Sequence, residues 1–167
     1  LYDDGKLTIE VYGTTAMPEL EKREYPWYDH NGEDYSGDIT EVVIGSGITT
    51  ISDYAFQNCD NLESVTMADT VTSIGREAFE GCENLETVTI SDSVKRVEDY
   101  SFDYCSKLTS IVIPNGVTYL GHEAFCNCTK LEDVVIPNSI TSIAVGAFEG
   151  ADLKSVTISN YVTDIGN

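Results

Sequence analysis

Hydrophobic positions recur along the chain with a period of 23 residues. One unit, VTMADTVTSIGREAFEGCENLET, runs from Val65 to Thr87, and its apolar positions fit neither one helix nor one strand. The aligned columns are Val65, Val88, Ile111 and Val134; Met67, Ile90, Ile113 and Ile136; Val71, Val94, Val117 and Ile140; Ile74, Val97, Leu120 and Ile143; Phe79, Phe102, Phe125 and Phe148; Cys59, Cys82, Cys105 and Cys128; Leu62, Leu85, Leu108 and Leu131. A fixed period in this range is typical of a solenoid.

The repeat begins at Val42 and continues to the last residue. The fifth copy is one residue shorter, because Phe148 to Leu153 is five steps where Phe125 to Leu131 is six. The sequence therefore predicts a repeat solenoid over residues 42–167, with five repeats of 22–23 residues and a truncated sixth.

Each repeat divides into short elements. Residues 62–67 alternate apolar and polar positions and are rich in β-branched residues across the copies, which predicts a strand. Strands at this period stack in parallel, about 4.8 Å apart. The Pro-Asn pair at 114–115 marks a turn, residues 71–74 form a second extended piece, and the spacing within 76–82 predicts one or two helical turns.

One column predicts how these helical turns end. Asn58, Gly81, Asn127 and Gly150 share it, as expected where a short helix ends in a left-handed residue. Tyr104 occupies the same column. Either the third helix continues there, or a tyrosine adopts a positive φ, which is strained.

Residues 1–41 do not fit the repeat and are expected to cap it. Residues 6–12 alternate like a half-buried strand, and the first rung of a solenoid needs such a cover for its apolar face. Residues 29–38 (DHNGEDYSGD) form a polar loop. We expect the truncated sixth rung at the other end to expose apolar residues and strand edges, and so to allow weak end-to-end self-association.

Charge narrows the classes of partner. The 29 acidic and 9 basic residues give a net charge of −20, which opposes binding to nucleic acid or to anionic membrane surfaces. No apolar run is long enough to span a bilayer, so membrane insertion is not expected. Because the chain begins at Leu1, we expect it to be a fragment of a longer precursor.

The five cysteines are expected to be reduced. Stacked inward-facing cysteines keep parallel side chains, so their Cβ atoms stay farther apart than the ~3.8 Å of a disulfide. Ala151 replaces one of them, which favours packing as their role. Zinc is not expected either, since Cys126 should point outward and Cys128 inward.

No other chemistry is indicated. A nucleophile, a base and an orienting group are needed together for covalent catalysis, but the only histidines are His30 in the lead-in and His122 at an outward position. Carboxylates in residues 29–38 are possible calcium ligands, although Gly32 is misplaced for an EF-hand; a solvated loop is the alternative. We predict no enzyme, no cofactor and no metal site.

The columns resemble the BspA-like type of leucine-rich repeat. Its rung reads IxxxVxxIGxxAFxxCxxLxxV, which residues 67–88 and 90–111 follow closely, and the AF or SF pair followed by Cys occurs four times. The lead-in is similar to the family's N-terminal cap at Leu7, Thr8, Ile9, Gly13, Ala16, Met17, Pro18, Pro26, Trp27 and Tyr28. The resemblance implies an α/β right-handed coil with the parallel sheet on the concave side and short helical turns on the convex side. It also implies a noncatalytic bacterial surface or secreted protein that adheres to host matrix proteins or other cells.

Two surfaces are candidates for partner binding. In a leucine-rich rung the strand residues between inward ones face the concave side; here these are Glu41, Ser64, Thr87, Ser110, Asp133 and Ser155, with Val43, Thr66, Thr89, Val112, Val135 and Thr157. This face is flat and suits a broad protein partner, or is merely a solvated sheet face. The second candidate is a tyrosine patch of Tyr54, Tyr100 and Tyr104, since tyrosines are favoured interface anchors, although scattered surface tyrosines are common. A structural spacer that presents another domain is the alternative function.

Overall fold

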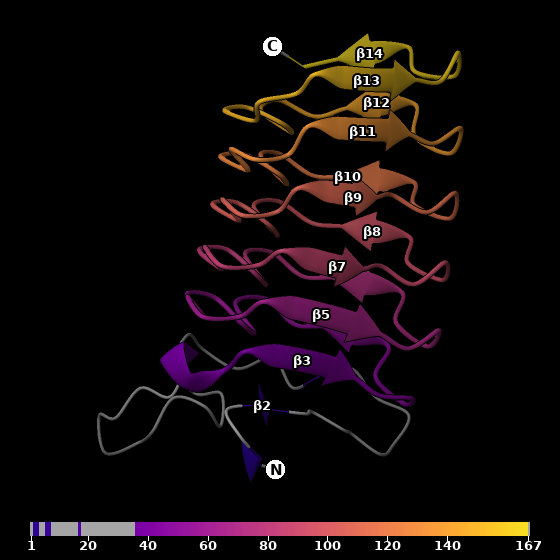
Figure 1. Ribbon diagram of the computed structural model, residues 1–167. Coiled ribbons are helices and arrows are strands. Elements are labelled where there is room, and N and C mark those ends of the chain that lie inside the picture. The colour runs from indigo at the N-terminus through magenta and orange to yellow at the C-terminus, as the bar shows by residue number, and fades with distance from the viewer. Residues whose placement is uncertain (1, 4–5, 8–16, 18–35, 167) are drawn as a thin grey trace.

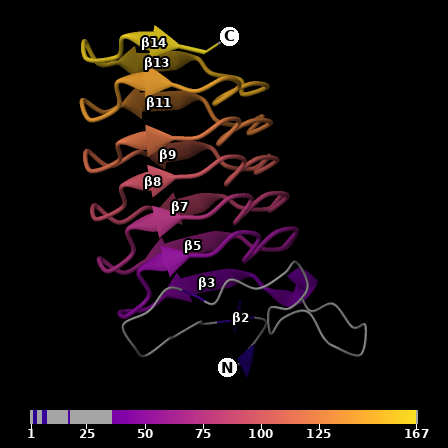
Figure 2. The same cartoon turned by 180° about the vertical axis from the view of Figure 1, so that it is seen from behind.

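The chain folds into a stack of rungs in which each rung carries two short strands. The computed structural model describes residues 2–3, 6–7, 17 and 36–166. The first strands of successive rungs form what we call the first ladder: β3 (Glu41–Ile44), β5 (Ser64–Met67), β7 (Thr87–Thr89), β9 (Ser110–Val112), β11 (Asp133–Ile136) and β13 (Ser155–Ile158). The second strands form the second ladder: β4 (Thr50–Ile51), β6 (Ser73–Ile74), β8 (Arg96–Val97), β10 (Tyr119–Leu120), β12 (Ser142–Ile143) and β14 (Asp164–Ile165). The two ladders run in opposite directions across the stack (Figure 1), and the view from behind brings the second ladder to the front (Figure 2).

The register of the strands follows the sequence period. All pairings within both ladders are parallel, and Val42 lies opposite Val65, 23 residues later. In the last rung Val134 lies opposite Val156 and Ser142 opposite Asp164, each 22 residues later. The one-residue shortening of the fifth copy is thereby confirmed, and the parallel stack predicted from the columns is correct.

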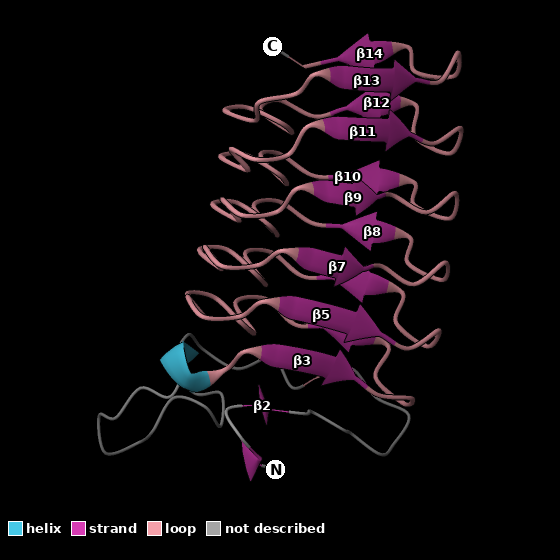
Figure 3. Cartoon of the chain, in the orientation of Figure 1, coloured by secondary structure: helices cyan, strands magenta, loops and turns pink. Residues whose placement is uncertain are grey.

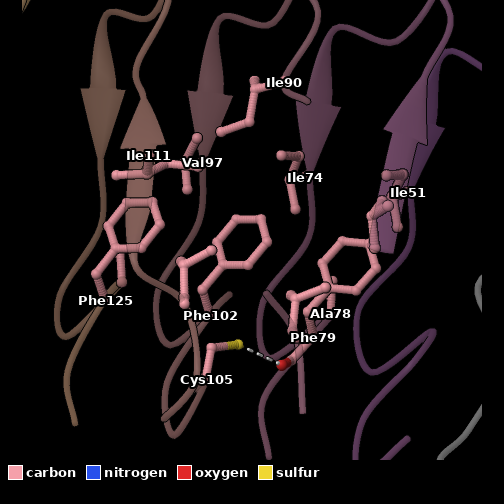
Figure 4. Close-up of a cluster of buried hydrophobic side chains, with 14 of the residues drawn as sticks. Ile51, Ile74, Ala78, Phe79, Ile90, Val97, Phe102, Cys105, Ile111 and Phe125 are labelled. Carbon is pink, nitrogen blue, oxygen red and sulfur yellow. Dashed lines mark hydrogen bonds between the residues drawn. The ribbon is translucent and has the colours of Figure 1, made fainter. Parts of the chain in front are cut away.

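The core between the ladders is a set of stacked side-chain columns. In β5 the alternation places Val65 and Met67 inward and Thr66 outward. Neighbouring phenylalanine rings lie nearly parallel from Phe56 to Phe125, with centroids 5.2 Å apart and interplanar angles of at most 9°. The row ends with Phe148, 5.6 Å from Phe125 and only partly buried. Figure 4 shows three of these rings in one row between the strands.

The predicted helical turns on the convex side are wrong. The only helix among the described residues is the 3-10 helix η1 (Ser36–Asp38), outside the repeats (Figure 3). The segments expected to be helical, which we call the arcs (residues 53–59 and their equivalents), are chains of hydrogen-bonded turns. Two residues in each arc have positive φ, and a right-handed helix cannot pass through a left-handed residue. These residues are Tyr54, Glu77, Tyr100, Glu123 and Gly146 in one column, and Asn58, Gly81, Tyr104, Asn127 and Gly150 in the other.

Backbone amides in the arcs alternate between two kinds of partner. Ala55 donates within its own rung to the carbonyl of Ser52, whereas Phe56 donates to the carbonyl of Ala78 in the following rung, 2.8 Å away. The same alternation recurs in the later arcs up to Asn127, which donates to Glu149. The arcs are therefore bonded from rung to rung, which an isolated helical turn would not allow, since its amides would be satisfied locally.

Tyr104 adopts a positive φ, which was one of the two alternatives predicted for it; the other was a continuing helix. Its φ is 58°, and its side chain is 53% exposed. A left-handed conformation costs an L-residue about 1–2 kcal/mol, and glycine avoids this cost while losing some chain entropy on folding. Tyr104→Gly is therefore expected to raise the free energy of unfolding by about 0.5–1 kcal/mol in urea titrations followed by circular dichroism.

Tyr161 provides the matched control for this substitution. It is also an exposed tyrosine, at 62%, but it is absent from the described residues with positive φ. Tyr161→Gly is expected to lower stability. Equal losses for the two variants would contradict the assignment of strain to Tyr104.

The N-terminal cap is only partly within the described residues. Strands β1 (Tyr2–Asp3) and β2 (Lys6–Leu7) form an antiparallel pair. Met17 is buried, and its amide donates to the carbonyl of Thr50 at 3.1 Å. The rest of the predicted strand at 6–12 and most of the acidic loop at 29–38 lie outside the described residues, so the cap and its boundary at residue 41 stay predictions.

Candidate functional site

The outward residues of the first ladder lie side by side within two three-stranded sheets, β3-β5-β7 and β9-β11-β13, and we call their surface the strand face. Cross-strand pairing places Ser64 next to Thr87, Thr66 next to Thr89, Ser110 next to Asp133, and Val112 next to Val135. All eight are exposed except Ser64, which is half-buried. The structure therefore brings together the residues predicted for this face.

Two valines stand out on the strand face. Val112 is 79% exposed and Val135 is 60% exposed, although most other positions carry serine or threonine. Val112 is the last residue of β9 and pairs with Val135 in the neighbouring strand β11, with Thr157 beside Val135 in β13. An exposed pair of β-branched apolar side chains on a flat sheet offers contact area to a partner rather than a pocket.

The three tyrosines of the predicted patch differ in exposure. Tyr100 and Tyr104 both lie in one arc at positive φ. Tyr100 is half-buried beneath Arg76, whose guanidinium carbon lies 4.9 Å from the ring centroid, and its hydroxyl donates to Glu123 at 3.4 Å. Tyr54 is also half-buried, so Tyr104 is the one strongly exposed member of the three.

The cysteines are free thiols that stabilise the stack through burial and hydrogen bonds. Cys82, Cys105 and Cys128 each donate to the carbonyl oxygen of a phenylalanine in the preceding rung, at 3.2–3.3 Å; Figure 4 shows the bond from Cys105 to Phe79. Burial raises the pKa of Cys82 and Cys105 well above the usual value and that of Cys128 to about 12. These thiols are inert at neutral pH, because the thiolate is the reactive form.

Cys126 does not join the core that contains Cys128, but it is buried all the same, which its predicted outward direction did not suggest. It is 4% exposed, and its sulfur lies in a group with carboxylate oxygens of Asp103 and Glu123, all within 4.8 Å of one another. Burial and these two carboxylates raise the pKa of Cys126 to about 12. The side-chain amide nitrogen of Asn127 donates to a carboxylate oxygen of Asp103 at 3.1 Å and to the sulfur of Cys126 at 3.2 Å. Within the described part of the chain, no fourth His, Cys, Asp or Glu joins this group. We interpret the group as a hydrogen-bonded contact between neighbouring rungs.

A cavity lies on the second ladder, near the C-terminal end of the stack. Its volume is about 300 Å³, and its lining includes Tyr119, His122, Ser142, Val145 and Asp164. The cavity was not predicted, because the pattern of the second strands indicates only extended pieces between turns. The size difference that indicates the cavity lies in one outward column, where a large aromatic residue is followed one rung later by a small one. This column holds Ser73, Arg96, Tyr119 and Ser142.

Among the described residues, none of the helical segments could span a bilayer. The calcium ligands proposed in the acidic loop, together with His30, lie outside the described residues except for 36–38 in η1. His122 is exposed.

Comparison with known proteins identifies the repeat. The BspA type leucine-rich repeat region matches residues 49–167 in six copies. A search of curated proteins finds no match. Among solved structures, a leucine-rich cell surface protein from Faecalibacterium prausnitzii is 31% identical with a TM-score of 0.74, over 100% of this chain and 48% of that one. A leucine-rich repeat protein from Eubacterium ventriosum is 29% identical with a TM-score of 0.64, over 100% of this chain and 59% of that one.

A leucine-rich repeat protein of T. pallidum is also similar, at 26% identity and a TM-score of 0.62, over 76% of this chain and 69% of that one. The chain thus spans about half the length of the two proteins that match it from end to end. The matched repeats, the 23-residue register and the stacked phenylalanine column agree with one another. The chain belongs to the BspA-type leucine-rich repeat family.

Proposed function

We propose that the chain is a noncatalytic, extracellular protein-interaction module of a bacterial surface or secreted protein, acting in adhesion to host matrix or cell-surface proteins. Leucine-rich repeat solenoids are typically interaction scaffolds, and one similar structure is described as a cell surface protein. The observation that carries the proposal is the exposed valine pair, Val112 and Val135, on the flat strand face.

Both the shape and the charge of this face favour a protein partner. Broad contact on a sheet surface needs apolar anchors surrounded by small polar residues, and the serines and threonines around the valines provide this rim. With a net charge of −20, the chain selects partners with a basic surface and steers their approach. Binding is therefore expected to weaken as salt concentration rises.

Two variants of equal charge test the proposal. Val112→Glu with Val135→Glu places two carboxylates in the middle of the strand face. Asn115→Glu with Asn138→Glu places two carboxylates on the exposed turns of the same two rungs. Retention of each purified protein on decellularised host matrix is measured at physiological salt, with unfolding midpoints as a check on the fold.

The strand-face variant is expected to lose at least about tenfold in apparent affinity, since each charge would be desolvated in the contact. The turn variant is expected to bind like the original chain. Equal binding by both variants would refute the strand face as the binding surface. No retention of the original chain would favour the alternative, a spacer that presents another domain.

A further inference from the structure

The outward residues of the second ladder contain an arginine bound to an aromatic ring. Arg96 in β8 lies opposite Tyr119 in β10, and its guanidinium carbon is 4.1 Å from the Tyr119 ring centroid. Glu98 accepts two hydrogen bonds from the same guanidinium, at 2.6 and 3.2 Å. The rung spacing of about 4.8 Å therefore accommodates one guanidinium stacked on one ring.

The other side of Tyr119 lacks a stacking partner of this kind. The next rung carries Ser142 at this position, and the rung after that carries Asp164. Because serine is small, the cavity of about 300 Å³ opens here between Tyr119 and Asp164. We call this space the Tyr119 slot. Two rung spacings, about 10 Å, separate the levels of its aromatic and carboxylate ends.

The residues around the slot fix its two ends. The Tyr119 hydroxyl donates to Asp99 at 3.1 Å, which holds the ring in place. The Ser142 hydroxyl donates to Asp164 at 3.3 Å, which holds the carboxylate at the far end. The slot thus presents an aromatic face at one end and a carboxylate at the other, with the level of Ser142 between them. A guanidinium at that level would meet the same two kinds of partner, a tyrosine ring and a carboxylate, that Arg96 has in Tyr119 and Glu98.

We propose that the Tyr119 slot binds an arginine side chain of a protein partner. This inference rests on the proposed function, since it specifies a chemical group by which a partner is recognised. A guanidinium stacks on an aromatic face and also donates hydrogen bonds to a carboxylate, whereas an ammonium does not stack in this way. An anionic group would meet Asp164 and the net charge of −20. The Arg96 charge on the opposite face of the ring is balanced by Glu98.

A peptide titration tests the slot without any natural partner. The probe is a Gly-Arg-Gly peptide blocked at both ends, and its control has citrulline, the uncharged analogue, in place of arginine. Backbone amide shifts of the ¹⁵N-labelled chain report the site. The arginine peptide is expected to shift the amides of Ser142, Asp164 and their neighbours, with a dissociation constant on the order of millimolar for an exposed site. The citrulline peptide is expected to bind at least about fivefold more weakly.

Two substitutions locate the interaction. Asp164→Asn is expected to lower the affinity for the arginine peptide about fivefold. Asp92→Asn removes an equal charge at an exposed position outside the slot and is expected to leave that affinity unchanged. Ser142→Arg fills the slot with the chain's own guanidinium and is expected to abolish the shifts.

The possible outcomes separate this proposal from the previous one. Equal binding of the arginine and citrulline peptides, or shifts unaffected by Asp164→Asn, would overturn the slot. Peptide binding together with absent matrix retention would leave the slot standing and refute the adhesion function. Matrix retention without peptide binding would refute the slot and leave the adhesion function standing.

Discussion

Phe102→Ala is expected to lower the free energy of unfolding by about 4 kcal/mol. The ring is fully buried and stacks on both sides, with Phe79 and Phe125 at 5.2 Å. Truncation removes the buried ring and leaves a cavity that neighbouring rungs cannot close, because their backbones are hydrogen-bonded to one another. Urea unfolding followed by circular dichroism measures the change. Given the typical stability of a domain, about 5–15 kcal/mol, such a loss is a large part of the total.

The last ring of the row provides the control. Phe148 is half-buried and stacks on one side only, on Phe125. Phe148→Ala is therefore expected to cost less than half as much as Phe102→Ala. Similar losses at the two positions would mean that the row does not act as one packed column, and that each ring packs mainly within its own rung.

Alkaline conditions are expected to destabilise the chain steeply. A thiol in the unfolded chain loses its proton near pH 8.5, whereas burial keeps Cys82, Cys105 and Cys128 protonated in the folded state, Cys128 up to about pH 12. Above pH 8.5 the unfolded state therefore binds fewer protons, and the free energy of unfolding falls with rising pH. Each thiol contributes about 1.4 kcal/mol per pH unit, so the three contribute about 4 kcal/mol per unit.

Urea titrations between pH 7.5 and 10.5 measure this slope. Below pH 8 the thiols are protonated in both states, and no dependence from them is expected. A variant in which the three cysteines are replaced by alanine, the residue found at position 151 of the fifth copy, is expected to lose that part of the slope. A variant slope as steep as the original would show that other groups cause the alkaline unfolding.

The rungs could be predicted from the sequence because their evidence is repeated. Five copies of the same apolar columns fix the period, and parallel stacking then follows from the need of each rung to bury both of its faces. The shortened fifth copy could be located from Phe148 and Leu153 alone, and its 22-residue register appears in both ladders.

The arcs could not be predicted in this way. A buried phenylalanine after alanine, with cysteine three residues later, fits both a helical turn and a chain of turns. The deciding positions are those with positive φ, and one of their two columns holds Tyr54, Glu77, Tyr100 and Glu123, which carry no glycine or asparagine signal. Hydrogen bonds to the next rung override the local preference, so the conformation is set by the stack and not by the segment.

The strand face could be predicted from the sequence and the Tyr119 slot could not, for a related reason. Alternation within one strand is enough to place Val112 and Val135 outward. The slot depends on a size difference between Tyr119 and Ser142 in adjacent rungs and on the shorter register that places Asp164 above them. A comparison of outward columns from rung to rung is needed to see it.

Hydrogen bonds between rungs run in both directions along the stack. In the arcs from Tyr54 to Asn127, each amide that leaves its rung donates to the following rung. Elsewhere around the rung the direction is opposite: the amides of Thr72, Gly75 and Lys95 donate to the preceding rung. Each inner rung therefore both donates to and accepts from each of its neighbours. A rung can join this stack only in one rotational setting, because any other setting would oppose donors to donors and acceptors to acceptors.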